Sequence, residues 1–300
     1  MSSVTNRVTE VKQPRGGYVK PSTFAKTVYD DGNHLEENEN IHPSIVGMVV
    51  DYMTRFLITT DVENAFNISI DGYCMRMEFL GNSISAEDVK KSGILKRNKR
   101  MTIEEAKRLF IITKDGENGA FSLLEQIKGL DDNSIIAACK IVTYDIWYRN
   151  PMIAMGAKNA EDTNPDKQTI NNIRILIQRC LLFLEAFGPV IAEDFVFAEE
   201  NKKGIVVKSG YTPTVDSGDG DYLTSDTMWD FKVSRSKLTS KQTLQLLMYY
   251  IMGKHSGMDI YKNIKKLGFF NPRLNVMHIL NVDDIPEEAI KNVEKEVICY

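Results

Sequence analysis

The sequence predicts an α+β fold in which helices flank a mixed central sheet, preceded by a helical N-terminal region. Three segments carry this prediction. Residues 227–233 alternate apolar and polar side chains with period two, which is typical of a half-buried strand. Residues 266–282 form two apolar runs around an Asn-Pro turn, and residues 169–187 place apolar side chains at helical spacing.

The sequence predicts that the N-terminal half consists of an arm followed by helices. Residues 1–40 are polar with few apolar anchors, so we expect a flexible or loosely docked arm. Helical periodicity then recurs over 43–58, 85–91, 102–112, 120–129 and 133–148, and residues 65–80 are a helix or a mixed segment because Gly72 interrupts them. A linker rich in Asn, Asp and Pro covers 150–167. The expected organisation is an arm over 1–40, a helical region over 41–165 and a sheet-bearing region over 166–300.

The C-terminal region alternates helices and strands. After the helix over 169–187, strands are expected around 194–198, at 221–224 and at 227–233. A Thr-Ser start signal predicts a helix over 240–252, followed by strands at 266–273 and 274–282. Proline and acidic residues then favour a closing helix over 286–296.

Composition describes an ordinary globular chain of 300 residues, 43% hydrophobic and 26% charged. No run approaches a membrane span and no signal-peptide core is present, so we expect a cytoplasmic protein without membrane contact. The four cysteines are scattered, which indicates neither a zinc site nor a disulfide framework. The oligomeric state is not predicted.

The net charge of −4 is unlike that of most nucleic-acid binders. A basic run between residues 90 and 100 could bind phosphates, although a solvated loop is the more favoured interpretation. Its six cations are Lys90, Lys91, Lys96, Arg97, Lys99 and Arg100.

The main candidate catalytic and metal-binding residues lie in the predicted hairpin of residues 221–233. Asp230 and Lys232 are two residues apart on one strand and so share a face. A turn at Ser225-Asp226 would bring Asp221 beside Asp230. Two adjacent carboxylates favour a hard divalent cation between them, and we expect Mg²⁺ or Mn²⁺. Lys232 would orient or deprotonate the attacking water and offset phosphate charge, and we expect it to serve catalysis and not folding.

This pattern resembles the PD-(D/E)XK nuclease superfamily, in its RecB-like branch. The motifs of that branch, Gly-x-x-Asp, Asp-x-Lys and a helical Gln-x-x-x-Tyr, match Gly218 to Asp221, Asp230 to Lys232 and Gln245 to Tyr249 in order and spacing. The resemblance covers roughly residues 170–282. It implies a divalent-metal-dependent nuclease, most simply of DNA, with RNA left open as a substrate.

The resemblance also implies an acidic residue on the helix before the first core strand. Glu185 is the only acid in an otherwise apolar stretch of that helix, so it is the candidate third metal ligand. The alternatives are a pair with Arg179 or a solvated helix end.

Gln245 and Tyr249 lie one turn apart, where they could touch a phosphate or brace the lysine, and Tyr249 could equally be a core tyrosine. Asp219, flanked by glycines, is expected on a flexible bend that points away from Asp221. The competing hypothesis to a nuclease is a non-catalytic DNA- or protein-binding module on the same fold.

Overall fold

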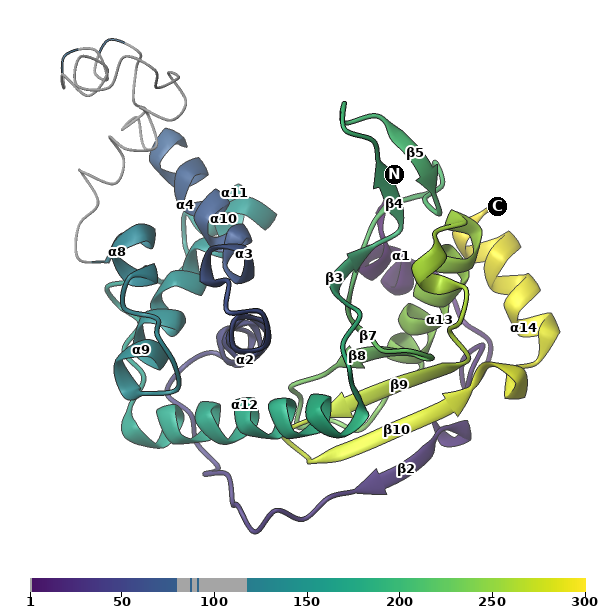
Figure 1. The fold of residues 1–300 in the computed structure, drawn as a ribbon, viewed down its shortest axis with the longest axis horizontal. Coiled ribbons are helices and arrows are strands. Elements are labelled where there is room, and N and C mark those ends of the chain that lie inside the picture. Colours follow the sequence, from purple (N-terminus) through teal and green to yellow (C-terminus); the bar gives the residue numbers. More distant parts are fainter. Residues whose placement is uncertain (1, 80–86, 88–90, 92–117) are drawn as a thin grey trace. The chain divides into compact units, whose positions relative to one another are not determined.

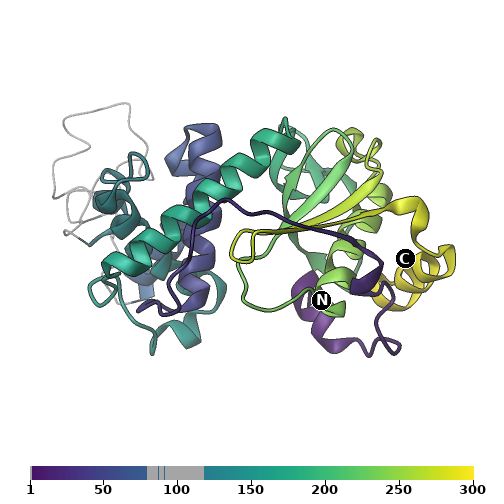
Figure 2. The same cartoon turned by 90° about the horizontal axis from the view of Figure 1, so that it is seen from below.

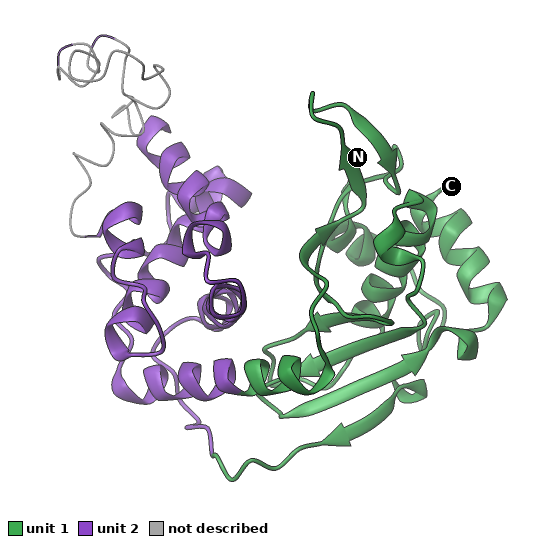
Figure 3. Cartoon of the chain, in the orientation of Figure 1, with its two compact units in different colours: residues 1–33, 179–300 green, residues 34–178 purple. Residues whose placement is uncertain are grey.

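The computed structural model describes residues 2–79, 87, 91 and 118–300, and the chain divides into two compact units (Figures 1 and 3). Unit 1 comprises residues 1–33 and 179–300, and unit 2 comprises residues 34–178. These boundaries differ from the expected 41–165 and 166–300. The first 33 residues join the C-terminal unit, and helix α12 (Lys167–Phe187) runs from one unit into the other (Figure 3).

Unit 1 is built on a six-stranded sheet with the order β2-β10-β9-β8-β7-β3. The strands in that order are β2 (Ala25–Val28), β10 (Val276–Asn281), β9 (Lys266–Asn271), β8 (Thr227–Phe231), β7 (Asp219–Leu223) and β3 (Ala192–Val196). Strands β8 and β9 pair in parallel and the other neighbours are antiparallel. The expected mixed sheet is therefore confirmed.

Two short sheets extend this unit. Strand β1 (Ser2–Ser3) pairs in parallel with β6 (Val215–Ser217), and β4 (Ala198–Glu200) forms an antiparallel hairpin with β5 (Val206–Ser209).

Alternation along β8 assigns its side chains to two faces of the sheet. Trp229 and Phe231 contact the ring of Phe183 on α12, at centroid distances of 4.9 and 5.5 Å. Met228 belongs to the core that also contains the buried side of α13 (Ser240–Ser256). Residues two apart on a strand share a face, so Asp230 lies with Met228 on the α13 side.

Helix α13 begins as the sequence predicts. The Thr239 side chain accepts from the Gln242 backbone N–H, and Gln242 in turn accepts from the Thr239 backbone N–H, which forms a capping box. The helix ends four residues later than expected, at Ser256, where Gly257 adopts a left-handed conformation with φ of 69°.

The N-terminal segment lies against the rest of unit 1 (Figure 2), and four of its apolar residues belong to the core of that unit. It forms α1 (Val4–Glu10), the short helix η1 (Pro21–Thr23) and the edge strand β2. Val4, Val8, Val19 and Phe24 are each at most 5% exposed. Burial of each such side chain contributes about 1.5–3 kcal/mol. The expected flexible or loosely docked arm is therefore wrong for residues 2–33: its apolar residues are few and scattered, but these four are buried in the core.

An ion pair fixes the end of this segment. The Arg179 guanidinium donates from Nε and Nη2 to the two carboxylate oxygens of Asp31, at 2.7 and 2.8 Å, and from Nη1 to the carbonyl of Pro272. The hydrogen bonds from Arg179 hold the pKa of Asp31 well below its usual range, against the opposing effect of burial.

Unit 2 is helical in its described residues. Its elements are α2 (Pro43–Thr59), α3 (Val62–Ala65), α4 (Asn67–Phe79), α8 (Ala120–Leu124), α9 (Asp132–Ile141), η2 (Val142–Tyr144), α10 (Asp145–Arg149) and α11 (Pro151–Ala154). The expected helix over 43–58 is confirmed, whereas the one over 133–148 is divided into three. At that division the Asp145 carboxylate, 1% exposed, accepts hydrogen bonds from Tyr52 and Ser69.

Most of the expected helices over 85–91 and 102–112, and most of the basic run, lie outside the described residues. Lys91, which is described, pairs with Glu87 at 3.2 Å.

The chain closes with η3 (Asp259–Tyr261), η4 (Val282–Asp284), α14 (Glu287–Asn292) and a π-helical segment, η5 (Val293–Ile298). Across the described parts of the chain, the helices are all too short or too polar to span a membrane.

Candidate active site

The β7–β8 hairpin brings the two predicted aspartates together. Tyr222 pairs with Trp229 and Leu223 pairs with Met228, so continuing the register by one residue sets Asp221 opposite Asp230. The Asp221 carboxylate accepts the backbone N–H of Phe231 through Oδ2 at 2.5 Å. The expected hairpin is confirmed, and Asp221 is bonded to the neighbouring strand.

Lys232 contacts the buried member of this pair. Asp230 is 2% exposed, and the Lys232 ammonium lies 2.9 Å from both of its carboxylate oxygens. The backbone N–H of Lys232 donates to the Phe270 carbonyl at 2.9 Å, which fixes the chain just beyond β8. The predicted shared face is confirmed. The ammonium contacts a buried carboxylate, so the prediction that Lys232 serves catalysis and not folding has to be tested with a stability measurement as well as a cleavage assay.

Helix α13 presents Tyr249 to the acids. Gln245 Nε2 donates to the Tyr249 hydroxyl at 2.8 Å, and the tyrosine is 3% exposed. Burial raises the pKa of Tyr249 well above 10, and the charge of Asp230 raises it further; Gln245 acts in the opposite direction, and Asp219 and Asp221 add smaller increases. Tyr249 is thus a buried core residue, as one interpretation held, and its neutral hydroxyl lies within electrostatic reach of three aspartates.

Asp219 differs from its expected placement. It is the first residue of β7 and pairs with Val196 in the sheet, and residues two apart on a strand share a face, so it lies on the same side as Asp221. The expectation that it points away was wrong. Asp219 and Asp221 are two residues apart in the sequence, and this spacing on one strand would have placed Asp219 correctly.

The glycines beside Asp219 are required by close packing and not by flexibility. A Cβ atom on Gly218 would lie 2.7 Å from Cγ2 of Val4, and one on Gly220 would lie 2.2 Å from the ring of Phe195. The Tyr211 hydroxyl donates to the Gly218 carbonyl at 2.7 Å. The turn that leads into β7 is therefore held from several sides.

Glu185 is not brought to the pair. It is exposed on α12, and α12 packs Phe183 and Phe187 against Trp229, on the face of the sheet opposite to Asp230. The expectation of enclosing apolar surroundings was wrong, because the apolar side of the helix turns toward the sheet and Glu185 turns away. The alternative pair with Arg179 is not formed either, since that guanidinium binds Asp31.

The donor chemistry at Asp221 and Asp230 fits a hard divalent cation, although the number of ligands is small. Within residues 2–79, 87, 91 and 118–300, no three His, Cys, Asp or Glu side chains are arranged to hold a metal. Magnesium commonly binds through one or two carboxylates and fills its remaining positions with water and substrate phosphate oxygens. The pair Asp221 and Asp230, without Glu185, matches that number of protein ligands.

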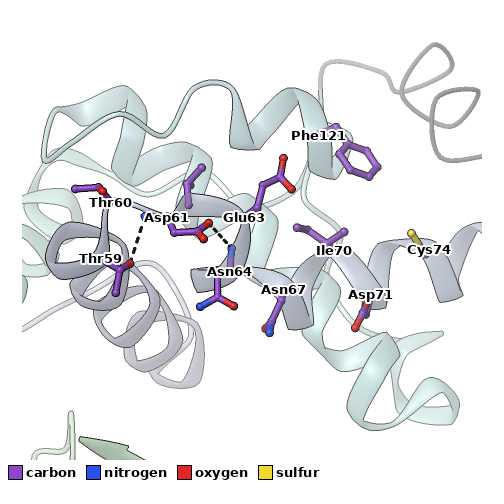
Figure 4. A pocket seen from close by; sticks show the side chains of 11 residues that line it. Thr59, Thr60, Asp61, Glu63, Asn64, Asn67, Ile70, Asp71, Cys74 and Phe121 are labelled. Carbon is purple, nitrogen blue, oxygen red and sulfur yellow. Dashed lines mark hydrogen bonds between the residues drawn. The ribbon is translucent and has the colours of Figure 1, made fainter. Parts of the chain in front are cut away.

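A separate pocket of about 1000 Å³ lies in unit 2 (Figure 4). Its acidic side chains include Asp61, which accepts from the Asn64 backbone N–H and caps α3. This acid has a structural role, and the pocket holds none of the motif residues.

Comparison with family models, curated proteins and solved structures finds no match for this chain. The interpretation of the site therefore depends on its own residues and geometry.

Proposed function

We propose that the chain is a divalent-metal-dependent nuclease that hydrolyses phosphodiester bonds in DNA. The observation that carries the proposal is the convergence of Asp221 and Asp230 from neighbouring strands, with the Lys232 ammonium 2.9 Å from the Asp230 carboxylate. The resemblance of the three motifs to RecB-like nucleases supports it. The helix acid of that pattern is not supplied by Glu185.

Each residue has a role that its position permits. Asp221 and Asp230 would hold Mg²⁺ or Mn²⁺, which would supply a more acidic water and positive charge beside the scissile phosphate. Water attacks the phosphorus atom and releases one proton to solvent, the bond from phosphorus to one ester oxygen breaks, and that oxygen takes up a proton from solvent. Lys232 orients the water and offsets the charge that develops on the phosphate oxygens.

Gln245 and Tyr249 would act as neutral partners. The raised pKa of Tyr249 keeps its hydroxyl protonated at physiological pH, so it can donate a hydrogen bond but cannot serve as a base. Gln245 fixes the direction of that hydroxyl through the 2.8 Å bond.

A non-catalytic DNA- or protein-binding module on the same fold is the second candidate. The observation in its favour is the sparse ligand set, since the described residues contain no group of three His, Cys, Asp or Glu side chains that could hold a metal, whereas a third acid was expected. The two candidates differ in metal-dependent cleavage.

The test is calorimetric titration with Mn²⁺ together with cleavage of single- and double-stranded DNA. Asp221→Ala and Asp230→Ala should each weaken Mn²⁺ binding strongly and abolish cleavage. Asp226→Ala is the matched control, because Asp226 also pairs with a lysine, Lys266 at 2.9 Å, but precedes β8 at its other end. Unchanged Mn²⁺ affinity in both test variants would remove the metal site, and DNA binding without cleavage by the wild type would favour the binding module.

A further inference from the structure

Two segments of unit 1 carry basic residues and no acid. Residues 11–29 contain Lys12, Arg15, Lys20 and Lys26, and residues 231–258 contain Lys232, Arg235, Lys237, Lys241 and Lys254. The chain as a whole has 41 acidic against 37 basic residues. These two segments therefore carry a net positive charge, whereas the protein as a whole carries a net negative charge.

The fold brings the two segments together at the start of α13. The Thr243 hydroxyl donates to the Val19 carbonyl at 2.6 Å. The Gly17 backbone approaches Ser240 so closely that a Cβ atom on the glycine would lie 2.7 Å from the Ser240 Cβ. Residues 15–20 thus lie beside the residues that open α13, and the buried Val19 anchors them there.

Four cations at this junction are available to a ligand. Arg15, Lys20, Lys237 and Lys241 are exposed, and the ion pairs among the described residues include none of them. Other exposed lysines of unit 1 are paired, for example Lys262 with Asp259 and Lys291 with Glu287. We call these four residues the basic surface.

The capping box of α13 uses the backbone N–H groups of Thr239 and Gln242. The inference therefore depends on the charges of the four side chains and not on the N-terminus of the helix. They are of the kind that binds a phosphate backbone without reading sequence.

The basic surface is continuous in the chain with the candidate active site. Lys232, whose ammonium contacts Asp230, begins the loop that carries Lys237 and leads into α13 at Ser240. A polyanion that follows this loop passes from the two aspartates to the junction with the N-terminal segment.

We propose that the basic surface binds the phosphate backbone of the DNA substrate beside the Asp221–Asp230 pair. This inference rests on the proposed function for the identity of the ligand. It assigns a function to the N-terminal segment, which places Arg15 and Lys20 beside the start of α13, some 200 residues later in the chain.

The test measures DNA binding without divalent metal, so that cleavage does not interfere. Fluorescence anisotropy of a labelled duplex and of a labelled single strand is recorded against salt for the wild type and two double variants, Arg15→Gln/Lys20→Gln and Lys237→Gln/Lys241→Gln. The matched control is Lys262→Gln/Lys265→Gln, which removes two exposed lysines beyond the far end of α13. Circular dichroism melting verifies that each variant folds.

Each lost phosphate contact lowers the slope of log affinity against log salt by about 0.9 for a duplex and about 0.7 for a single strand. Each test variant should therefore lose about 1.8 of the duplex slope. Between 50 and 200 mM salt, the wild type should lose about 12-fold more duplex affinity than either test variant. The control should keep the wild-type slope.

Unchanged slopes in both test variants, or no DNA binding by the wild type, would overturn the inference. Failure of the proposed function gives a different result: the basic surface binds DNA with the expected slopes, but Mn²⁺ produces no cleavage. Conversely, cleavage by the wild type with unaltered binding in the double variants would refute the basic surface and leave the nuclease intact.

Discussion

Replacing Lys232 tests both the chemistry and the folding of the site. Lys232→Met keeps much of the aliphatic stem and removes the ammonium that lies 2.9 Å from both oxygens of Asp230. If the lysine assists proton transfer or charge stabilisation, DNA cleavage should fall by about 10²–10⁴-fold. Because Asp230 is 2% exposed, the same change should also lower the free energy of unfolding.

The stability effect can be bounded from the structure. Removing one partner of a buried ion pair costs about 3–5 kcal/mol, and the Lys232 side chain is 27% exposed, so we expect a lower value of about 2–4 kcal/mol. In a unit of this size, 1 kcal/mol shifts Tm by about 2–4 °C, which gives a decrease of about 4–16 °C. Lys232→Arg keeps a cation beside Asp230 and should retain most stability while still losing cleavage.

A second lysine–aspartate pair provides the control. Lys266 contacts Asp226 at 2.9 Å, with side chains 40% and 38% exposed, at the other end of the β8–β9 strand pair. Lys266→Met should cost less than about 1 kcal/mol and leave cleavage unchanged, because the pair is open to solvent.

The assays are metal-dependent cleavage of labelled DNA and chemical denaturation of each variant. Wild-type cleavage by a folded Lys232→Met protein would refute the proposed role of the lysine in catalysis. A stability loss no larger than that of Lys266→Met would instead refute the argument from the buried pair.

Three further predictions address neighbouring residues. Asp219→Asn should reduce cleavage less than Asp221→Asn does, because Asp219 is exposed whereas Asp221 is bonded to the Phe231 backbone. The reverse order in a cleavage assay would mean that the metal ligand is Asp219 and not Asp221. Tyr249→Phe should leave the pH profile of cleavage unchanged below pH 10, because the raised pKa of Tyr249 keeps its hydroxyl neutral. A pH-dependent step below pH 10 that is present in the wild type and absent from the variant would contradict this prediction. Asp31→Asn should cost about 2–3 kcal/mol at neutral pH. Because the folded-state pKa of Asp31 is lowered, the carboxylate stabilises the folded protein fully above the unfolded pKa of 3.8, and this stabilisation is lost as the pH falls below that value. An equal difference in denaturation midpoint between Asp31→Asn and the wild type at neutral and at strongly acid pH would refute this prediction.

The local sequence pattern was sufficient to predict those helices and strands whose boundaries depend on nearby residues. Period-two alternation around Trp229 identified β8, and the Thr239 cap identified the start of α13, because both depend on neighbours within a few residues. The shared face of Asp230 and Lys232 followed from strand geometry alone. The contact of Asp221 with the next strand required only a short hairpin.

Placements that depend on distant partners were not predictable in this way. Glu185 looked enclosed because its sequence neighbours are apolar, but which side of α12 faces the sheet is set by the packing of Phe183 and Phe187 on Trp229. Tertiary packing, and not helix composition, decides which side chain reaches the site.

The N-terminal segment illustrates the same limit. Val4 and Val19 are isolated apolar residues in a polar stretch, and their burial depends on contacts with α13 and the C-terminal residues more than 200 positions away. The order and spacing of residues in the sequence therefore determined the α+β class and the carboxylate–lysine motif. Only the tertiary structure placed β2 in the sheet and set Arg15 and Lys20 beside α13, because burial of each apolar anchor is a property of the assembled core and not of its neighbours in sequence.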